Sequence, residues 1–176
     1  MNNIDSTIPF MPINIGLITI SDTRKEDNDK SGNLLKERIT NFGHKILIKK
    51  IVSDDINKIK ETIVSLAQDS KIDAIITTGG TGLTGRDSTY EAVTALSDKI
   101  IHGFGELFRQ ISFKKIGTST IQSRAIAAVI NNTYIFCLPG SPSACKDGWE
   151  NILQYQLDIR HKPCNFIEIM PRLKEK

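Results

Sequence analysis

The chain has 176 residues, a length typical of one domain whose core is large enough to fold without disulfides or a structural metal. Apolar residues make up 39% and charged residues 24%, which excludes a disordered chain. The net charge is only +3 and the basic residues are dispersed, so no nucleic-acid surface is indicated. The three cysteines form no CxxC pair, so neither a disulfide framework nor a zinc site is indicated.

The sequence shows no pattern typical of membrane insertion or export. Its longest purely apolar stretch, residues 125–130, is far shorter than the ~20 residues that a membrane-spanning helix needs. Residues 1–6 lack the basic and then apolar order of a signal peptide. We therefore expect a soluble, cytoplasmic protein that binds neither membrane nor nucleic acid.

Strand and helix patterns alternate along the chain. Runs rich in β-branched residues predict strands at residues 14–21, 44–52, 73–78, 126–130 and 133–138. Apolar residues at helical spacing predict helices that begin near residues 31, 56, 88, 104 and 143, the last continuing to residue 159. This order predicts an α/β fold: a three-layer αβα sandwich with a mostly parallel, Rossmann-like sheet.

The ends of several elements carry local signals. Asn131-Asn132 lies between two strand patterns and predicts a hairpin, which would add an antiparallel strand to the sheet. Gly43 is placed to end the first helix, and Ser53-Asp54-Asp55 offers an N-cap to the second. Ser88, with Glu91 three residues later, predicts a capping box for the third.

The same pattern sets the domain boundaries. Pro9 and Pro12 predict an extended, flexible arm over residues 1–12, and the charged residues 171–176 predict a tail. We expect residues 13–170 to form a single domain, without internal repeats or linkers.

A glycine-rich loop, Gly79–Gly85, follows the third predicted strand and precedes a helix. Glycine allows a sharp turn close to a ligand, and the amides of a helix start together with threonine hydroxyls can hold phosphate. The alternative is a turn that needs glycine only for its own geometry. Residues 80–85 also match the GxGxxG form of a dinucleotide fingerprint, although that motif normally follows the first strand.

Two carboxylates, Asp54 and Asp87, fall at the carboxyl edge of the predicted sheet. If the second and third strands flank the first, these residues start about 10 Å apart, because neighbouring strands are about 4.8 Å apart. A Mg²⁺ ion with bound phosphates could bridge that distance, since magnesium takes one or two carboxylates together with phosphate oxygens and waters. The pair favours phosphoryl or nucleotidyl transfer over hydride transfer. Helix capping is the alternative for each residue.

A third candidate segment, Leu138–Ala144, follows a predicted buried strand and leads into a predicted helix. Its prolines fix the loop, its glycine permits close approach, and the helix start offers amides. Thr118–Thr120 and Ser123-Arg124 add hydroxyls and a cation that suit an oxygenated, anionic ligand. A rigid turn and polar capping are the alternatives for these segments.

Five stretches stand out together: residues 20–24 with 29–32, residues 77–89, residues 103–106, residues 117–124, and residues 138–142. In this order they resemble the MoaB/Mog family of molybdenum cofactor biosynthesis proteins, over residues 14–165. Residues 103–109, 116–120 and 149–152 are most similar to the MoaB-type members. One position departs from the family pattern: the proline of its RDxTP stretch is Tyr90 here, a change that spares Asp87.

The resemblance implies adenylylation of molybdopterin to molybdopterin adenylate, with ATP and Mg²⁺ used and pyrophosphate released. It implies Asp54 and Asp87 as catalytic residues that hold Mg²⁺ and place the α-phosphate of ATP against the terminal phosphate of molybdopterin. Such a transfer requires positioning and charge neutralisation rather than a covalent nucleophile. The substrate-binding residues that the resemblance implies are Ser21, Asp22, Thr78, Gly79, Gly80, Thr81, Gly82, Thr89, Ser119, Ser123, Arg124, Pro139, Gly140, Ser141 and Pro142.

The resemblance also bears on partners. Relatives form trimers or hexamers, so a homo-oligomer is implied, together with contacts to other proteins of the pathway. Two alternative functions stay open: a non-catalytic molybdopterin-binding or carrier protein with the same pocket, and an NAD-dependent oxidoreductase that rests on the GxGxxG match alone.

Overall fold

The five predicted strands and one short strand that was not predicted, Lys99–Ile100, form a six-stranded, mostly parallel sheet. The computed structural model describes residues 3–175, and the strand order within them is β3-β2-β4-β7-β6-β5. Strands β3, β2, β4 and β7 are parallel, whereas β6 and β5 run antiparallel to their neighbours. The strand bounds are β2 Asn14–Ile20, β3 Lys45–Val52, β4 Ala74–Thr78, β5 Lys99–Ile100, β6 Ile126–Ile130 and β7 Thr133–Leu138.

The register of the four parallel strands brings their carboxyl ends level. Ile20 pairs with Val52, and Thr78 pairs with both Thr19 and Leu138. The loops that follow these strands therefore leave the sheet side by side, at the edge where ligands bind in open α/β sheets. The second and third predicted strands do flank the first, which was the condition for Asp54 and Asp87 to start on neighbouring loops.

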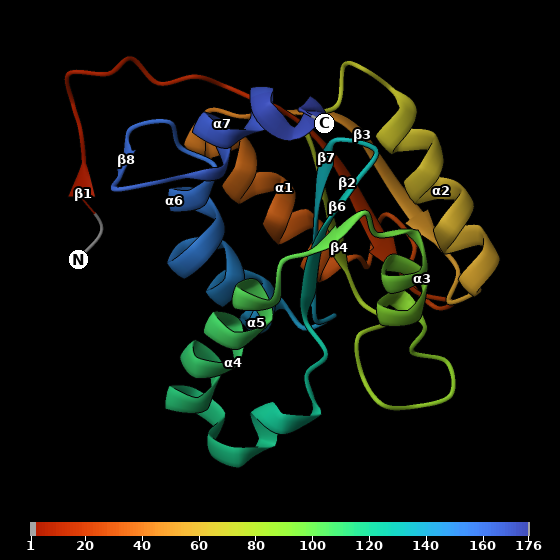
Figure 1. Cartoon of the computed structure of the whole chain (residues 1–176). Helices are drawn as coiled ribbons and strands as arrows, with labels where there is room; N and C mark the ends of the chain where they lie inside the picture. The colour runs from red at the N-terminus through yellow and green to blue at the C-terminus, as the bar shows by residue number, and fades with distance from the viewer. Residues whose placement is uncertain (1–2, 176) are drawn as a thin grey trace.

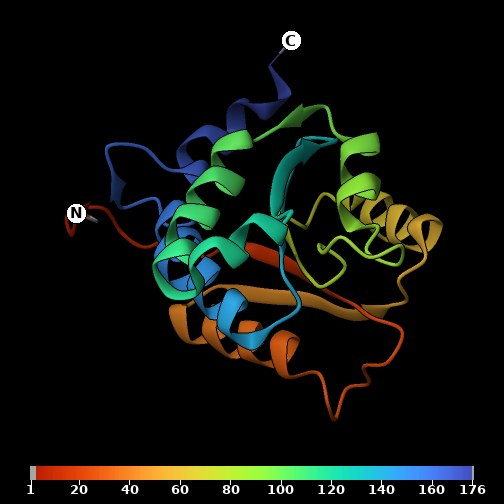
Figure 2. The same cartoon turned by 90° about the horizontal axis from the view of Figure 1, so that it is seen from below.

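Helices cover both faces of the sheet, as the three-layer prediction requires. Figures 1 and 2 show α1 (Lys30–Phe42), α4 (His102–Ile116) and α5 (Pro142–Gly148) on one side and α2 (Ile56–Gln68) and α3 (Thr89–Leu96) on the other. Shorter helical segments complete the chain: η1 (Gly117–Gln122), η2 (Trp149–Leu153), α6 (Gln154–Gln156), α7 (Phe166–Ile169) and η3 (Met170–Lys174). No helix among the described residues is long and apolar enough to cross a membrane.

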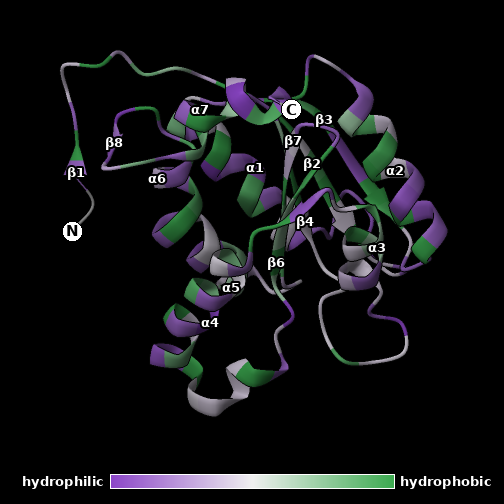
Figure 3. Cartoon of the chain, viewed as in Figure 1, coloured by the Kyte–Doolittle hydropathy of each residue, from purple (hydrophilic) through white to green (hydrophobic). Residues whose placement is uncertain are grey.

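The core consists of two apolar layers, one on each face of the sheet. In β2, Ile15 and Leu17 pack toward α1, whereas Ile18 and Ile20 pack toward α2, as the two-residue period of a strand dictates. Figure 3 shows the hydrophobic colour along much of β2 and β6 and both colours alternating along α2 and α4. Each fully buried Ile or Leu stabilises the fold by about 1.5–3 kcal/mol.

Most local predictions are confirmed, and two are wrong. The hairpin turns through Asn131 and Asn132, both with positive φ, as its turn type requires. The last long helix ends at Gln156 rather than at residue 159, and it contains a π-helical turn at Trp149–Leu153, which apolar spacing does not reveal. The predicted capping box is absent, because the Ser88 hydroxyl donates instead to the Asp54 carbonyl at 3.2 Å.

Both chain ends lie against the domain. Strand β1 (Asn3–Ile4) pairs antiparallel with β8 (His161–Lys162), and the Phe10 ring packs against Phe42. The predicted arm thus makes contacts over residues 3–10, while residues 1 and 2 lie outside the described residues. The predicted tail begins within η3, where Leu173 packs against the core, and residue 176 also lies outside the described residues.

A buried ion pair anchors α1 and the loop before it to the sheet. The Asp29 carboxylate, whose side chain is 0% exposed, accepts hydrogen bonds from the Thr19 hydroxyl at 2.8 Å and the Gly32 amide at 2.9 Å. Lys49 Nζ of β3 lies 2.9 Å from the same carboxylate. Burial alone would raise the pKa of Asp29, but the hydrogen bonds from Lys49, Gly32 and Thr19 hold that pKa below its ordinary value.

The substitution Asp29→Asn removes this charge and leaves Lys49 unpaired. We expect the free energy of unfolding to fall by about 3 kcal/mol at neutral pH. Because the pKa of Asp29 is lower in the folded than in the unfolded chain, its contribution is complete above about pH 4 and is lost as the pH falls. Urea unfolding should show the difference between variant and native chain shrinking at acidic pH. A difference that does not change with pH would contradict this assignment.

Candidate active site

A cleft of about 500 Å³ opens at the edge where the four parallel strands end. Loops after β2, β3, β4 and β7 line it, together with the start of α1 and the end of η1. Twelve of the seventeen predicted site residues line this cleft: Ser21, Asp54, Thr78, Gly79, Gly80, Thr81, Gly82, Asp87, Ser123, Pro139, Gly140 and Ser141. Residues that are far apart in the sequence thus meet in one place.

The glycine-rich loop begins with a turn that only glycine can make here. Gly79 has a φ of 103° and Gly80 a φ of 63°, both in the left-handed region. A Cβ on Gly79 would collide with the carbonyl oxygen of Ile20, and one on Gly80 would collide with the Thr89 hydroxyl. The turn therefore packs directly on the end of β2 and on the first turn of α3.

Asp54 is held at the cleft by its neighbour across the sheet. The Asp22 amide donates to Asp54 Oδ2 at 3.0 Å, and the Asp54 amide donates to Asp22 Oδ1 at 3.1 Å. The N-cap of α2 is Asp55, which accepts from the amides of Asn57 and Lys58 at 2.9 and 3.0 Å. Asp54 is therefore not engaged as a helix cap.

Asp87 closes the outer part of the glycine-rich loop. Its Oδ2 accepts hydrogen bonds from the Thr84 amide at 2.9 Å and the Thr84 hydroxyl at 2.6 Å. Gly82 must lack a side chain beside it, because a Cβ there would lie 2.7 Å from Asp87 Oδ2. These contacts fix the carboxylate beside the loop that is predicted to hold phosphate.

The two catalytic candidates differ in how readily they ionise. Burial raises the pKa of Asp54 above its ordinary value, and the nearby Asp22 and Asp87 carboxylates raise it further. Burial also acts to raise the pKa of Asp87, but the hydrogen bonds from Thr84 and the charge of Arg124 lower it below its ordinary value. The cleft thus brings together carboxylates whose repulsion a bound cation would relieve.

Arg124 lies behind the cleft rather than in it. Its Nε donates to the Gly82 carbonyl at 2.7 Å, and one terminal nitrogen donates to the Asp87 carbonyl at 2.7 Å. Its other terminal nitrogen pairs with Glu91, and the guanidinium carbon lies 5.3 Å from the centroid of the Tyr90 ring. The guanidinium thus joins the two ends of the Gly82–Asp87 segment, and its role in substrate binding, which the resemblance implies, stays a prediction.

Besides Arg124, four predicted site residues do not line the cleft, and each lies in a different part of the structure. The buried Thr89 hydroxyl donates to the Gly79 carbonyl at 3.0 Å and so supports the turn from beneath. Asp22 is exposed and lies 3.2 Å from Arg86. Ser119 is exposed on η1, and Pro142 is the first residue of α5.

Six further residues line the cleft without having been predicted as site residues: Thr19, Ile20, Thr23, Arg24, Ser31 and Gln122. Thr19 and Ile20 are the last residues of β2, and their position next to the following loop was the signal available. Thr23, Arg24 and Ser31 belong to motif segments of the family resemblance, so the motif itself could have indicated them.

The carboxylates at the cleft could hold a metal ion only if a bound ligand supplied further coordinating atoms. Within residues 3–175, no three His, Cys, Asp or Glu side chains are grouped so as to hold a metal by themselves. Asp54 and Asp87 supply two carboxylates, which is the usual protein contribution to a Mg²⁺ site completed by phosphate oxygens and waters. The residues present therefore fit magnesium brought together with a nucleotide.

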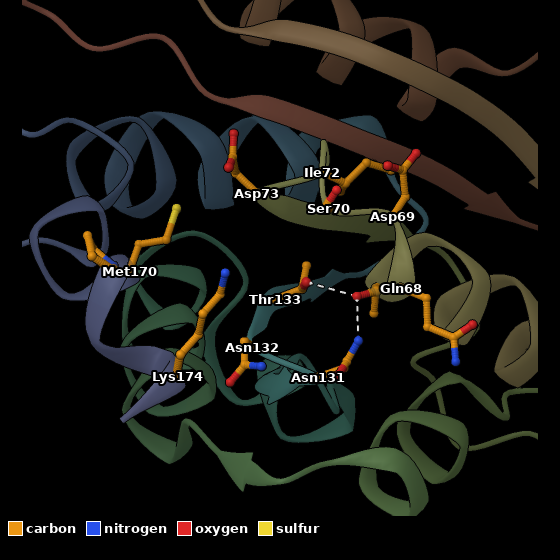
Figure 4. A pocket seen from close by; sticks show the side chains of 12 residues that line it. Gln68, Asp69, Ser70, Ile72, Asp73, Asn131, Asn132, Thr133, Met170 and Lys174 are labelled. Carbon is orange, nitrogen blue, oxygen red and sulfur yellow. Dashed lines mark hydrogen bonds between the residues drawn. The ribbon is translucent and has the colours of Figure 1, made fainter. Parts of the chain in front are cut away.

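A second hollow, of about 560 Å³, lies at the opposite edge of the sheet. Figure 4 shows it between the β6–β7 turn, the segment before β4 and η3, with the Ala67 carbonyl accepting from Asn131 Nδ2 at 2.9 Å and from the Thr133 hydroxyl at 3.4 Å. None of the predicted site residues lines it. The functional candidates therefore concentrate in the smaller cleft.

The comparison with known families agrees with this arrangement. The family described as "Probable molybdopterin binding domain" matches residues 16–159, a range that includes the cleft and, except for the first two residues of β2, the four parallel strands. The chain belongs to the MoaB/Mog family. The "Molybdenum cofactor biosynthesis protein B" of Escherichia coli strain K12 is 43% identical over 166 residues, covering 94% of this chain and 96% of that protein.

Solved structures of the MoaB/Mog family have the same fold. One titled "Crystal structure of Molybdenum cofactor biosynthesis protein B" has a TM-score of 0.84 at 38% identity and covers 94% of this chain and 98% of that one. The tungsten cofactor synthesizing protein MoaB from Pyrococcus furiosus has a TM-score of 0.74 at 34% identity, with coverages of 93% and 98%. The three-layer α/β prediction is confirmed.

The turn at Gly79 requires a residue without a side chain, and this requirement can be tested. We expect Gly79→Ala to lower the free energy of unfolding by more than about 2 kcal/mol, because it combines a left-handed φ with a backbone collision. Gly85→Ala is the matched control: a Cβ there meets no atom within 4 Å and its φ is unstrained. Urea unfolding of both variants tests the difference. Equal stability of the two variants would contradict the packing of Gly79 against Ile20.

Proposed function

We propose that the protein acts in molybdenum cofactor biosynthesis, as an adenylyltransferase that converts molybdopterin and ATP to molybdopterin adenylate and pyrophosphate. The observation that carries the proposal is the placement of Asp54 and Asp87 on one cleft beside a glycine-rich loop. Relatives named for molybdenum cofactor biosynthesis at 43% identity supply the pathway. The adenylyl transfer itself is what the family resemblance implies, and the carboxylate pair and the glycine-rich loop support it.

The residues divide the work of such a transfer. Asp54 and Asp87 would hold Mg²⁺, which when bound neutralises charge on the ATP phosphates. The amides of Gly80 and Thr81 would receive the phosphates, since glycine lets the backbone approach them closely, whereas the Gly79 amide already donates to the Leu138 carbonyl. A terminal phosphate oxygen of molybdopterin would attack the α-phosphorus of ATP while the bond to the β-phosphate breaks, and pyrophosphate would leave with the electron pair.

A covalent intermediate on this chain is not part of the proposal. The thiol nearest the cleft floor is Cys145, whose sulfur lies 3.0 Å from the Thr78 hydroxyl. Burial raises the pKa of Cys145 to about 12, so the thiol stays protonated and is a poor nucleophile at neutral pH. Positioning and charge neutralisation are the means that the cleft offers.

The proposal predicts that both carboxylates are required for turnover. Asp87→Asn and Asp54→Asn should each lower single-turnover formation of molybdopterin adenylate by at least about 100-fold, while molybdopterin affinity stays within about threefold of the native chain. Asp55→Asn is the matched control, because it lies next to Asp54 but caps α2, a task that Asn also performs. The measurement follows adenylate and pyrophosphate after mixing with Mg²⁺-ATP.

The outcomes separate the proposal from its alternative. No adenylate from the native chain, with tight molybdopterin binding retained, would replace the transferase by a carrier with the same pocket. Full activity of Asp87→Asn would remove Asp87 from the mechanism.

We also propose that the chain self-associates as a trimer or hexamer, as the family resemblance implies. Exposed apolar side chains on α4 and η1 support a protein interface: Phe113 is 55% exposed, Ile116 54% and Ile121 80%. Sedimentation velocity should show a species of three or six chains. A monomer at micromolar concentration would contradict the proposal.

A further inference from the structure

The cleft is polarised between the two layers of the fold. Asp54 precedes α2 and Asp87 precedes α3, so both carboxylates belong to the α2–α3 side. Arg24, in the loop before α1, and Ser31, in the first turn of α1, line the cleft from the α1–α5 side. The carboxylates thus belong to segments that lead into α2 and α3, whereas the cation and the hydroxyl belong to the segment that leads into α1.

Arg24 differs from the other cations near the cleft in having no carboxylate partner within residues 3–175. Lys49 pairs with Asp29, Arg86 with Asp22, and Arg124 with Glu91. The guanidinium of Arg24 makes one long contact, from Nη1 to the Asn28 carbonyl at 3.4 Å. Among the residues that line the cleft it is the only Lys or Arg. Most of its donors thus remain available to an anion.

The loop that carries Arg24 is shaped independently of any ligand. The Ser21 hydroxyl accepts from the amides of Thr23 and Arg24 at 3.2 and 3.3 Å. The Lys25 amide donates to Asn28 Oδ1 at 2.8 Å, and the loop ends at the buried Asp29. Arg24 is therefore presented from a fixed backbone, which lowers the entropic cost of ordering the loop on binding.

Ser31 supplies a second polar group on this side. It is 6% exposed, and it lines the cleft at the second residue of α1, where the helix dipole favours a negative charge. A planar guanidinium and a hydroxyl at a helix start suit a phosphate group, which accepts several hydrogen bonds and carries up to two charges.

We propose that Arg24, assisted by Ser31, binds the terminal phosphate of the pterin substrate and so holds the acceptor on the α1–α5 side of the cleft. The inference rests on the proposed function, in which the nucleotide and its magnesium lie on the α2–α3 side with Asp54 and Asp87. Arg24 touches the substrate but exchanges no proton. Its charge reduces the repulsion between the incoming phosphate and the α-phosphate of ATP.

The test compares a phosphorylated ligand with its dephosphorylated form. Isothermal titration calorimetry without oxygen measures the affinity of the native chain and of Arg24→Ala for molybdopterin and for molybdopterin treated with phosphatase. We expect Arg24→Ala to weaken molybdopterin binding by about 10- to 100-fold, the range of a lost charge-assisted contact. Affinity for the dephosphorylated ligand and for Mg²⁺-ATP should change by less than about twofold.

Two more variants sharpen the comparison. Arg24→Lys should fall between the native chain and Arg24→Ala, since an ammonium keeps the charge but not the two-pronged geometry. Lys25→Ala, in the same loop but outside the cleft lining, controls for net charge and should bind as the native chain does.

Each other outcome overturns the inference. Equal losses for both forms of the pterin would show that Arg24 shapes the loop without contacting phosphate. A loss confined to Mg²⁺-ATP would place Arg24 on the nucleotide, and an equal effect of Lys25→Ala would reduce the result to net charge. Failure of the native chain to bind molybdopterin at all would instead remove the proposed function, and this inference with it.

Discussion

The contact between Gly79 and the end of β2 is the constraint on which the site depends. Gly79 leaves no room for a Cβ against the Ile20 carbonyl, and its Cα lies within 3.3 Å of the position a Cβ on Gly140 would take. Its amide donates to the Leu138 carbonyl at 3.0 Å, and its carbonyl accepts from Thr89. Gly79 thus contacts the ends of β2, β4 and β7 and the start of α3. These contacts are possible because the strand register brings the three strand ends level with one another.

Around that contact, residues next to Asp54 and Asp87 make the structural hydrogen bonds, so the two carboxylates are left at the cleft. Asp55 caps α2 and leaves Asp54 at the cleft. Arg124 bridges the carbonyls of Gly82 and Asp87, and the Tyr90 ring lies beside its guanidinium where the family pattern has proline. The loop that bears Asp87 is therefore ordered before any ligand arrives, which is the preorganisation that charge-stabilising catalysis requires.

The sequence predicted the sheet, its edge and most of the cleft because those features depend on local signals. Runs of β-branched residues mark the strands, and the glycines of residues 79–85 mark the loop that is predicted to bind phosphate. It did not reveal that Arg124 donates to the Gly82 and Asp87 carbonyls, because these partners lie 42 and 37 residues away in the chain. It also missed the π-helical turn at Trp149, since a one-residue insertion into a helix has no periodic signature.

The most direct test of the account is the position of a divalent ion in the cleft. Crystals grown with Mn²⁺ and a non-hydrolysable ATP analogue would locate the metal by its anomalous scattering. The account predicts one strong peak within coordination distance of both the Asp54 and the Asp87 carboxylates, with the analogue's phosphates against Gly79–Gly82. A metal and nucleotide bound elsewhere, with these two carboxylates uncoordinated, would contradict it.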